Sequence, residues 1–110
     1  MAGKFECYKD KAGEFRFRLK AGNGETILSS EGYKSKSSCT NGIESVKKNC
    51  LDEACFEKKT TPSGKFRFNL KARNGQVIGT SQNYSSESSR DNGIGAVGRA
   101  AKDAAVVEVD

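Results

Sequence analysis

Hydrophobic and polar residues alternate along residues 14–20, and the same alternation returns at residues 65–71. In the first of these stretches the apolar positions are Phe15, Phe17 and Leu19. A period of two predicts a strand with one face buried and one face in solvent. The dipeptide Asn23-Gly24 follows at once, and it favours a type I′ turn between antiparallel strands. We therefore expect a hairpin whose return strand is residues 26–29.

After Tyr33 the apolar spacing changes to that of an α-helix. Ser35 is a suitable N-cap, and the apolar residues that follow it lie on one helical face. These residues are Cys39, Ile43 and Val46. Gly42 and its counterpart Gly93 lie inside the two expected helices, where glycine costs about 1 kcal/mol relative to alanine. A close approach of each helix backbone to the sheet accounts for them best.

A shift of 51 residues aligns the two halves of the chain without a gap. Under this shift the stretch Gly13–Gly24 falls on Gly64–Gly75, with the same alternation and the same turn dipeptide. The opening strand Phe5–Tyr8 falls on Phe56–Lys59, and a second shift falls on Val107–Asp110. The chain is therefore a tandem duplication that ends in a third copy of its opening strand. The segment around Phe56 both ends one copy and begins the next.

This order of elements predicts an α+β fold of two tandem β(3)-α-β repeats. Because a three-stranded unit with one apolar face needs a covering layer, we expect the repeats to share one antiparallel sheet with both helices on one face. We also expect the C-terminal strands to be exchanged between the repeats, since joining them removes exposed sheet edges. The prediction is a single pseudo-twofold domain, residues 1–110, made of repeat one (4–54) and repeat two (55–110).

Two long motifs resemble a known family of small bacterial proteins. They are KFECYKDKAGEFRFRLKAGNGETILSSEGYKSK with NGIESVKKN, repeated as GKFRFNLKARNGQVIGTSQNY with NGIGAV. Together they resemble the YegP-like family, which consists of single or tandem copies of a domain of about fifty residues and unknown function. The resemblance covers essentially the whole chain. It implies paired β(3)-α-β units in one sheet with exchanged C-terminal strands, and it brings no catalytic residue. Gly95 and Gly98 make the second helix poorer in side chains than the first.

Composition narrows the function classes. The 110 residues carry a formal net charge of +5 and a pI near 9.1, less basic than a dedicated nucleic-acid-binding domain. No apolar stretch approaches membrane-spanning length, so we expect a cytoplasmic protein without a membrane partner. The family resemblance also implies a monomer, because single-copy relatives are understood to dimerise and this two-copy chain looks like a covalent version of that dimer. With no histidine in the chain, the commonest general base is absent, and we expect no enzymatic activity.

The four cysteines do not form a recognisable site. Their spacing matches no paired zinc motif, so we expect neither a metal nor a cofactor. Under the 51-residue shift each one falls on a different residue type, so the fold does not require them. We interpret them as buried free thiols. They are Cys7, Cys39, Cys50 and Cys55.

The outward positions of the alternating strands form the candidate interaction surface. They are Arg16, Arg18 and Lys20 in repeat one, and Arg67, Asn69 and Lys71 in repeat two. Two such basic ladders suit phosphates or an acidic partner. A solvated sheet face is the simpler interpretation, because sheets that bind single strands of RNA expose aromatic residues for stacking. The aromatic residues of these strands point to the opposite side.

Tyr33 and Tyr84 occupy equivalent junctions between strand and helix. We favour a core-closing role with the hydroxyl at the rim over a pair of ligand-stacking rings. The serine-rich segments that follow, residues 35–38 and 85–89, are explained by helix capping.

The sequence therefore predicts a non-enzymatic interaction module that binds a protein or a small acidic ligand. An alternative is weak nucleic-acid binding through the outer sheet face. A further alternative is an enzyme with a site between the repeats. The nucleic-acid alternative rests on Arg16, Lys20, Arg67 and Lys71.

Overall fold

The computed structural model describes residues 3–102 and 104–109. Repeat one contains β1 (Lys4–Lys9), β2 (Phe15–Lys20), β3 (Thr26–Ser29) and α1 (Lys36–Asn49). A 3-10 turn, η1 (Glu53–Cys55), leads to repeat two. Repeat two contains β4 (Phe56–Thr60), β5 (Phe66–Lys71), β6 (Val77–Thr80), α2 (Glu87–Lys102) and β7 (Ala105–Glu108). The predicted α+β class and the β(3)-α-β order are confirmed.

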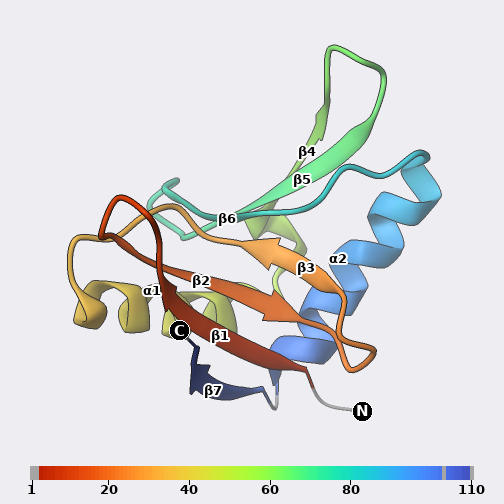
Figure 1. The fold of residues 1–110 in the computed structure, drawn as a ribbon. Helices are drawn as coiled ribbons and strands as arrows, with labels where there is room; N and C mark the ends of the chain where they lie inside the picture. Colours follow the sequence, from red (N-terminus) through yellow and green to blue (C-terminus); the bar gives the residue numbers. More distant parts are fainter. Residues whose placement is uncertain (1–2, 103, 110) are drawn as a thin grey trace.

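The strands form one sheet in the order β4-β5-β6-β3-β2-β1-β7 (Figure 1). The two repeats join where β3 pairs with β6, and in this pair Ser29 lies opposite Thr80. All strand pairs are antiparallel except that of β1 and β7, which is parallel. The sheet is therefore mixed rather than purely antiparallel. Parallel neighbours cannot be joined by a tight turn, and β1 and β7 are accordingly far apart in the chain, as the first and last of the described strands.

The exchange of strands between repeats is visible at the sheet edge. β7 ends repeat two, yet it lies beside β1 of repeat one, and the Val109 N–H donates to the Cys7 carbonyl over 2.9 Å. The strand that ends the first copy, β4, pairs with β5 of the second. Each helix also packs against strands of both repeats, α1 on β2, β5 and β6, and α2 on β1, β2, β3 and β5. The two copies therefore share one core.

That core lies between the sheet and the two helices, which cover the same face (Figure 1). The alternating strands contribute Phe17, Leu19, Phe68 and Leu70, all with no exposed surface. The Phe5 ring meets Phe17 edge-on at 5.8 Å, and Phe56 meets Phe68 in the same way at 5.5 Å. Burial of such rings supplies the main driving force for joining the layers.

The hairpin turns differ in type from the sequence prediction. A type I′ turn requires positive φ at both central residues, but among the described residues only glycines have positive φ. Gly24 has φ 87°, and its N–H donates to the Ala21 carbonyl at 2.9 Å. Asn23 instead turns its side chain to accept the Glu25 N–H at 3.0 Å. With this hydrogen bond in place, only Gly24 of the turn adopts a left-handed φ. The equivalent turn of repeat two has Gly75 at φ 87°.

The helix starts match the prediction. Ser35 Oγ accepts the Ser38 N–H, and Ser86 Oγ accepts the Ser89 N–H, both at 3.1 Å. Each serine thereby satisfies one of the free N–H groups at its helix start. In the part of the chain that the structure describes, no helix is both long and apolar enough to cross a membrane.

Candidate interaction surfaces

The open face of the sheet, turned away from the helices, carries the predicted basic side chains. Arg16, Arg18 and Lys20 alternate with buried residues of β2, so they share this face. Arg67 and Lys71 occupy the equivalent places on β5. The structure thus gathers the predicted residues into two groups, one at each end of the sheet.

A carboxylate lies at the centre of the first group. Glu6 of β1 faces Arg18 across the strand pair, and Arg18 Nε donates to Glu6 Oε1 at 2.6 Å. Lys20 and Lys4 approach the same carboxylate at 3.4 and 3.3 Å. The Glu6 side chain is only 7% exposed. The Arg18 hydrogen bond, with those from Lys4 and Lys20, lowers the pKa of Glu6 to about 2 despite its burial.

Repeat two has the same arrangement around Glu57. Lys71 Nζ lies 2.8 Å from Glu57 Oε2, and Asn69 Nδ2 donates to Oε1 at 3.2 Å. Lys59 adds a longer ion pair of 3.6 Å. The Lys71 hydrogen bond, followed by that from Asn69, lowers the pKa of Glu57 to about 2. Asn69, where repeat one has Arg18, leaves this group with one cation fewer.

Two further side chains on the open face, those of Asp10 and Tyr8, were not anticipated from the sequence. Asp10, at the turn after β1, accepts from Arg16 Nε at 2.6 Å, and this hydrogen bond lowers the pKa of Asp10. Tyr8 lies under Arg18, whose guanidinium carbon is 4.6 Å from the ring centroid. The carboxylates Glu6 and Glu57 could have been singled out from the sequence, because the 51-residue shift places one on the other.

These contacts change what the open face can do. Arg16, Arg18, Lys20 and Lys71 each have a carboxylate partner. Arg67 is exposed and forms no ion pair with any residue that the structure describes. A ligand anion would have to compete with built-in carboxylates for nearly every cation, so the face presents far less free positive charge than the sequence suggests.

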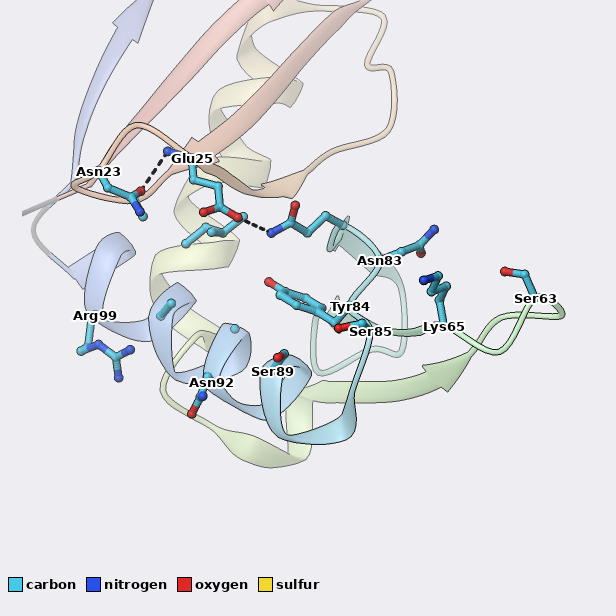
Figure 2. Close-up of a pocket in the computed structure, with 15 residues that line it drawn as sticks. Asn23, Glu25, Ser63, Lys65, Asn83, Tyr84, Ser85, Ser89, Asn92 and Arg99 are labelled. Carbon is cyan, nitrogen blue, oxygen red and sulfur yellow. Dashed lines mark hydrogen bonds between the residues drawn. The ribbon is translucent and has the colours of Figure 1, made fainter.

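A second surface, the inter-repeat cleft, has a volume of about 780 Å³. Repeat one lines it with the β2–β3 hairpin, and repeat two with its first turn, the segment before α2, and α2 itself. Its walls are Ala21, Asn23, Glu25, Ile27, Ser63, Lys65, Gln82, Asn83, Tyr84, Ser85, Ser89, Asn92, Gly93, Ala96 and Arg99. Figure 2 shows Tyr84 in the middle of the cleft, between Glu25 and α2.

The charges of the inter-repeat cleft are spread along its length. Lys65 and Arg99 lie towards opposite ends in Figure 2, and neither forms an ion pair with a described residue. Between them, Gln82 Nε2 donates to Glu25 Oε1 at 2.6 Å, which joins the two repeats across the opening. The sequence suggested a site between the repeats only as an alternative and named none of these residues, because they come from four segments whose proximity follows only from the β3–β6 junction.

Tyr84 keeps its predicted structural role and also lines the inter-repeat cleft. Its ring stacks on Phe68 at 6.3 Å, as Tyr33 stacks on Phe17 at 6.3 Å. The tyrosines close the core on one side, and the Tyr84 side chain extends into the cleft on the other (Figure 2).

The thiols are buried, as predicted, and free. Cys7 and Cys39 lie 3.5 Å apart between β1 and α1. Burial, together with the Cys7 contact, raises the pKa of Cys39 to about 12, and burial also raises those of Cys50 and Cys55. The described residues contain no group of three or more Cys, Asp or Glu side chains able to hold a metal ion.

Comparison with known proteins agrees with this architecture. The family model described as "Domain of unknown function (DUF1508)" matches residues 10–57 and again residues 62–108. The chain is 65% identical over 109 residues to the UPF0339 protein in the ptx operon 5′ region of Stutzerimonas stutzeri, covering 99% of this chain and 98% of that protein. It is 57% identical over 97 residues to the UPF0339 protein YegP of Escherichia coli K12, covering 88% of each.

Two solution NMR structures have the same fold. One is yegP from E. coli, a protein of unknown function, with a TM-score of 0.93 and 52% identity over 98% of this chain and 93% of that one. The other is a UPF0339 protein from Shewanella oneidensis, with a TM-score of 0.92 and 49% identity over 98% and 92%. Two family matches in tandem and relatives this similar over nearly the whole chain show that the protein belongs to the DUF1508 family, as a two-repeat UPF0339/YegP-like member.

Proposed function

We propose that the protein is a non-enzymatic interaction module whose inter-repeat cleft binds a small acidic ligand. The observation that carries this proposal is the lining of the cleft. It brings hydroxyl groups of repeat two and amide groups of both repeats together with Lys65 and Arg99, two cations that no described carboxylate neutralises. Concave sites with a few convergent polar groups are the usual form of a small-molecule site.

The arrangement of the cleft narrows the chemistry of the ligand. Because Lys65 and Arg99 lie towards opposite ends, an acidic group is stabilised at either end rather than in the middle. The middle contains Glu25, which repels an anion and accepts hydrogen bonds, and the Tyr84 side chain. A chain of hydroxyl groups with a carboxylate or phosphate at its end fits this order of charges.

The absence of an enzymatic role is supported by the state of the candidate nucleophiles and acids. The thiols are buried, and a raised pKa disfavours the reactive thiolate. Glu6 and Glu57 have lowered pKa values, which suits a fixed anion and not a general acid at neutral pH. Nucleic-acid binding through the open face has less support than the cleft, since most of its cations are already paired.

Three six-carbon probes test the proposal. Glucarate carries a carboxylate at each end, gluconate at one end, and sorbitol at neither. We expect glucarate to bind more tightly than gluconate, and sorbitol not to bind, by isothermal titration and by the rise in Tm that a ligand of the folded state produces. Lys65→Glu and Arg99→Glu should each weaken glucarate binding at least tenfold.

Lys48→Glu is the matched control, because Lys48 is the exposed counterpart of Arg99 on α1 and does not line the cleft. This variant should bind glucarate as the unmodified chain does. Equal affinity for all three probes, or an equal loss in the Lys48 and Arg99 variants, would contradict a cleft that selects acidic ligands.

A further inference from the structure

The two edges of the sheet are not equivalent, although the sequence repeats. β4 is the counterpart of β1 under the 51-residue shift, and both are followed by an equivalent hairpin. β1 has β7 along its outer side, whereas β4 ends the sheet among the described residues (Figure 1). The reason is that β4 serves both as the last strand of one copy and the first of the next. The position beside β4 that corresponds to β7 is therefore filled by no described segment of the chain.

β7 shows how a strand would lie at that position. It runs parallel to β1 with Val106 opposite Phe5 and Glu108 opposite Cys7, and the Cys7 carbonyl accepts the Val109 N–H. Alternate residues of a strand direct their backbone N–H and C=O groups to the same side. By the repeat equivalence, Phe56 and Lys58 direct theirs to the free side of β4. Such an edge is able to accept another strand.

The groove between β4 and α2 is open where its counterpart in repeat one is closed. Phe5 and Ile43 have no exposed surface, whereas their counterparts Phe56 and Ile94 are partly exposed. Phe56 and Ile94 line two adjoining hollows of about 340 and 280 Å³. Leu51, 72% exposed, lines the second hollow. Exposed apolar groups gathered in one groove are typical of an interaction site.

Two glycines of α2 keep this groove open. Gly95 and Gly98 line it at positions where α1 carries Glu44 and Lys47. Packing within the chain does not require Gly95, since an added Cβ would meet only the flexible guanidinium of Arg99, at 3.0 Å. Glycine inside a helix costs about 1 kcal/mol relative to alanine. Its presence at this position is explained if another chain occupies the space.

Charge does not favour an acidic occupant of the groove. Lys58 lies on the groove side of β4, but Asp91 of α2 already pairs with it at 3.2 Å. In repeat one Lys36 of α1 pairs with Glu108, whereas the counterpart of Lys36 in α2 is Glu87. Charged edge residues such as Lys58 also disfavour pairing between two copies of β4. The complementary partner is therefore a different strand, with small or β-branched apolar residues for the groove.

We propose that the free edge of β4 and the adjoining groove on α2 bind an extended segment of a partner protein by parallel strand addition. The segment places small or β-branched residues over Phe56 and Ile94. Strand addition of this kind obtains affinity from main-chain hydrogen bonds and specificity from the side chains that enter the groove. The site is distinct from the inter-repeat cleft, with which it shares only Arg99.

The chain supplies its own probe, a capped synthetic peptide of residues 104–110, Ala-Ala-Val-Val-Glu-Val-Asp. Titrated into the isotope-labelled full chain, it should shift the amide signals of β4 and of residues 91–98 in a saturable manner. It should also slow hydrogen exchange at the Lys58 amide, while the β1 amides stay unchanged.

Two variants test the groove without disturbing the core. Gly95→Glu restores the residue type of α1 and fills the groove, so it should weaken peptide binding at least tenfold. Lys59→Glu, which adds a carboxylate on the open face instead, should bind as the unmodified chain does. The proposal is overturned by the absence of shifts at millimolar peptide, by shifts confined to β1, by equal binding in both variants, or by self-association of the chain through β4.

Discussion

Gly42 lies directly against the hydroxyl of Tyr33. A Cβ atom on Gly42 would be 2.6 Å from Tyr33 Oη and 3.0 Å from the Phe17 ring. Gly93 meets Tyr84 in the same way in repeat two. The predicted close approach of each helix backbone is confirmed, and the neighbour is an aromatic ring stacked on a core phenylalanine. Glycine is therefore a packing requirement at both positions.

Gly42→Ala should destabilise the protein although alanine is the better helix former. The added methyl group overpacks the Tyr33 contact, a change that costs about 1–3 kcal/mol in a packed core. Urea unfolding followed by circular dichroism measures the loss. Gly95→Ala is the matched control, because its Cβ meets only the end of the Arg99 side chain. That variant should be stabilised by up to about 1 kcal/mol, and a Gly42→Ala variant as stable as this control would contradict the packing argument.

Glu6→Gln should destabilise the protein more than Glu57→Gln. Glu6 is nearly buried and holds Arg18, Lys20 and Lys4, whereas Glu57 is 33% exposed and holds two lysines and an amide. Losing the charged acceptor for Arg18 should lower the free energy of unfolding by about 1–2 kcal/mol. Chemical denaturation of both variants at pH 7 makes the comparison, and an equal effect at the two positions would show that burial does not distinguish them.

The same carboxylates make stability depend on acid. Their pKa values of about 2 in the folded protein lie below the ordinary value of 4.5. A lowered folded pKa adds stability above pH 4.5, and this contribution is lost as the pH falls towards 2. Denaturation midpoints measured between pH 6 and pH 2 should fall most steeply below pH 4.5. In the Glu6→Gln/Glu57→Gln variant this decline should be shallower, and an unchanged decline would assign the acid sensitivity to other groups.

Ser30 is identical in both copies for a reason that the sequence pattern does not reveal. Its Oγ accepts the buried Phe17 N–H at 2.9 Å and donates to the Glu31 carbonyl at 2.8 Å. Ser81 repeats this with Phe68 and Gln82. Ser30→Ala should cost about 1–3 kcal/mol, because it leaves a buried N–H without its side-chain acceptor. Thermal unfolding of this variant beside Ser29→Ala, an exposed neighbour, measures the difference.

Local periodicity predicted the elements, the repeat and the single covered face, because these follow from the spacing of residues such as Phe15, Phe17 and Leu19. The turn type was wrong because the Asn23 side chain caps the Glu25 N–H and holds Asn23 out of the left-handed region. The pairing of Glu6 with Arg18 depends on strand register, and the inter-repeat cleft depends on the β3–β6 junction. Both features bring together residues from different segments, so the spacing of apolar residues along one segment does not reveal them.

The cysteines should react slowly in the folded protein. All four are buried, and burial raises the pKa of Cys39 to about 12, far above the pH of a labelling reaction. With iodoacetamide at pH 8, labelling should be at least tenfold slower than for the chain in 6 M guanidinium chloride. Mass spectrometry of the native and unfolded samples resolves each site. Rapid labelling of any cysteine under native conditions would show that its burial is not maintained in solution.

Nucleic acid should bind the open face only weakly, and the binding should depend on Arg67 more than on Arg16. Arg16 is held by Asp10 over 2.6 Å, whereas Arg67 is exposed and has no ionic partner among the described residues. Labelled single- and double-stranded oligonucleotides across a salt series measure this. The logarithm of the affinity falls linearly with the logarithm of the salt concentration, with a slope proportional to the number of phosphates contacted. Arg67→Glu should abolish the low-salt association, and Arg16→Glu should reduce it less. Micromolar binding near physiological salt, lost equally in both variants, would instead mean that nucleic acid displaces Asp10 and that the open face is a genuine binding site.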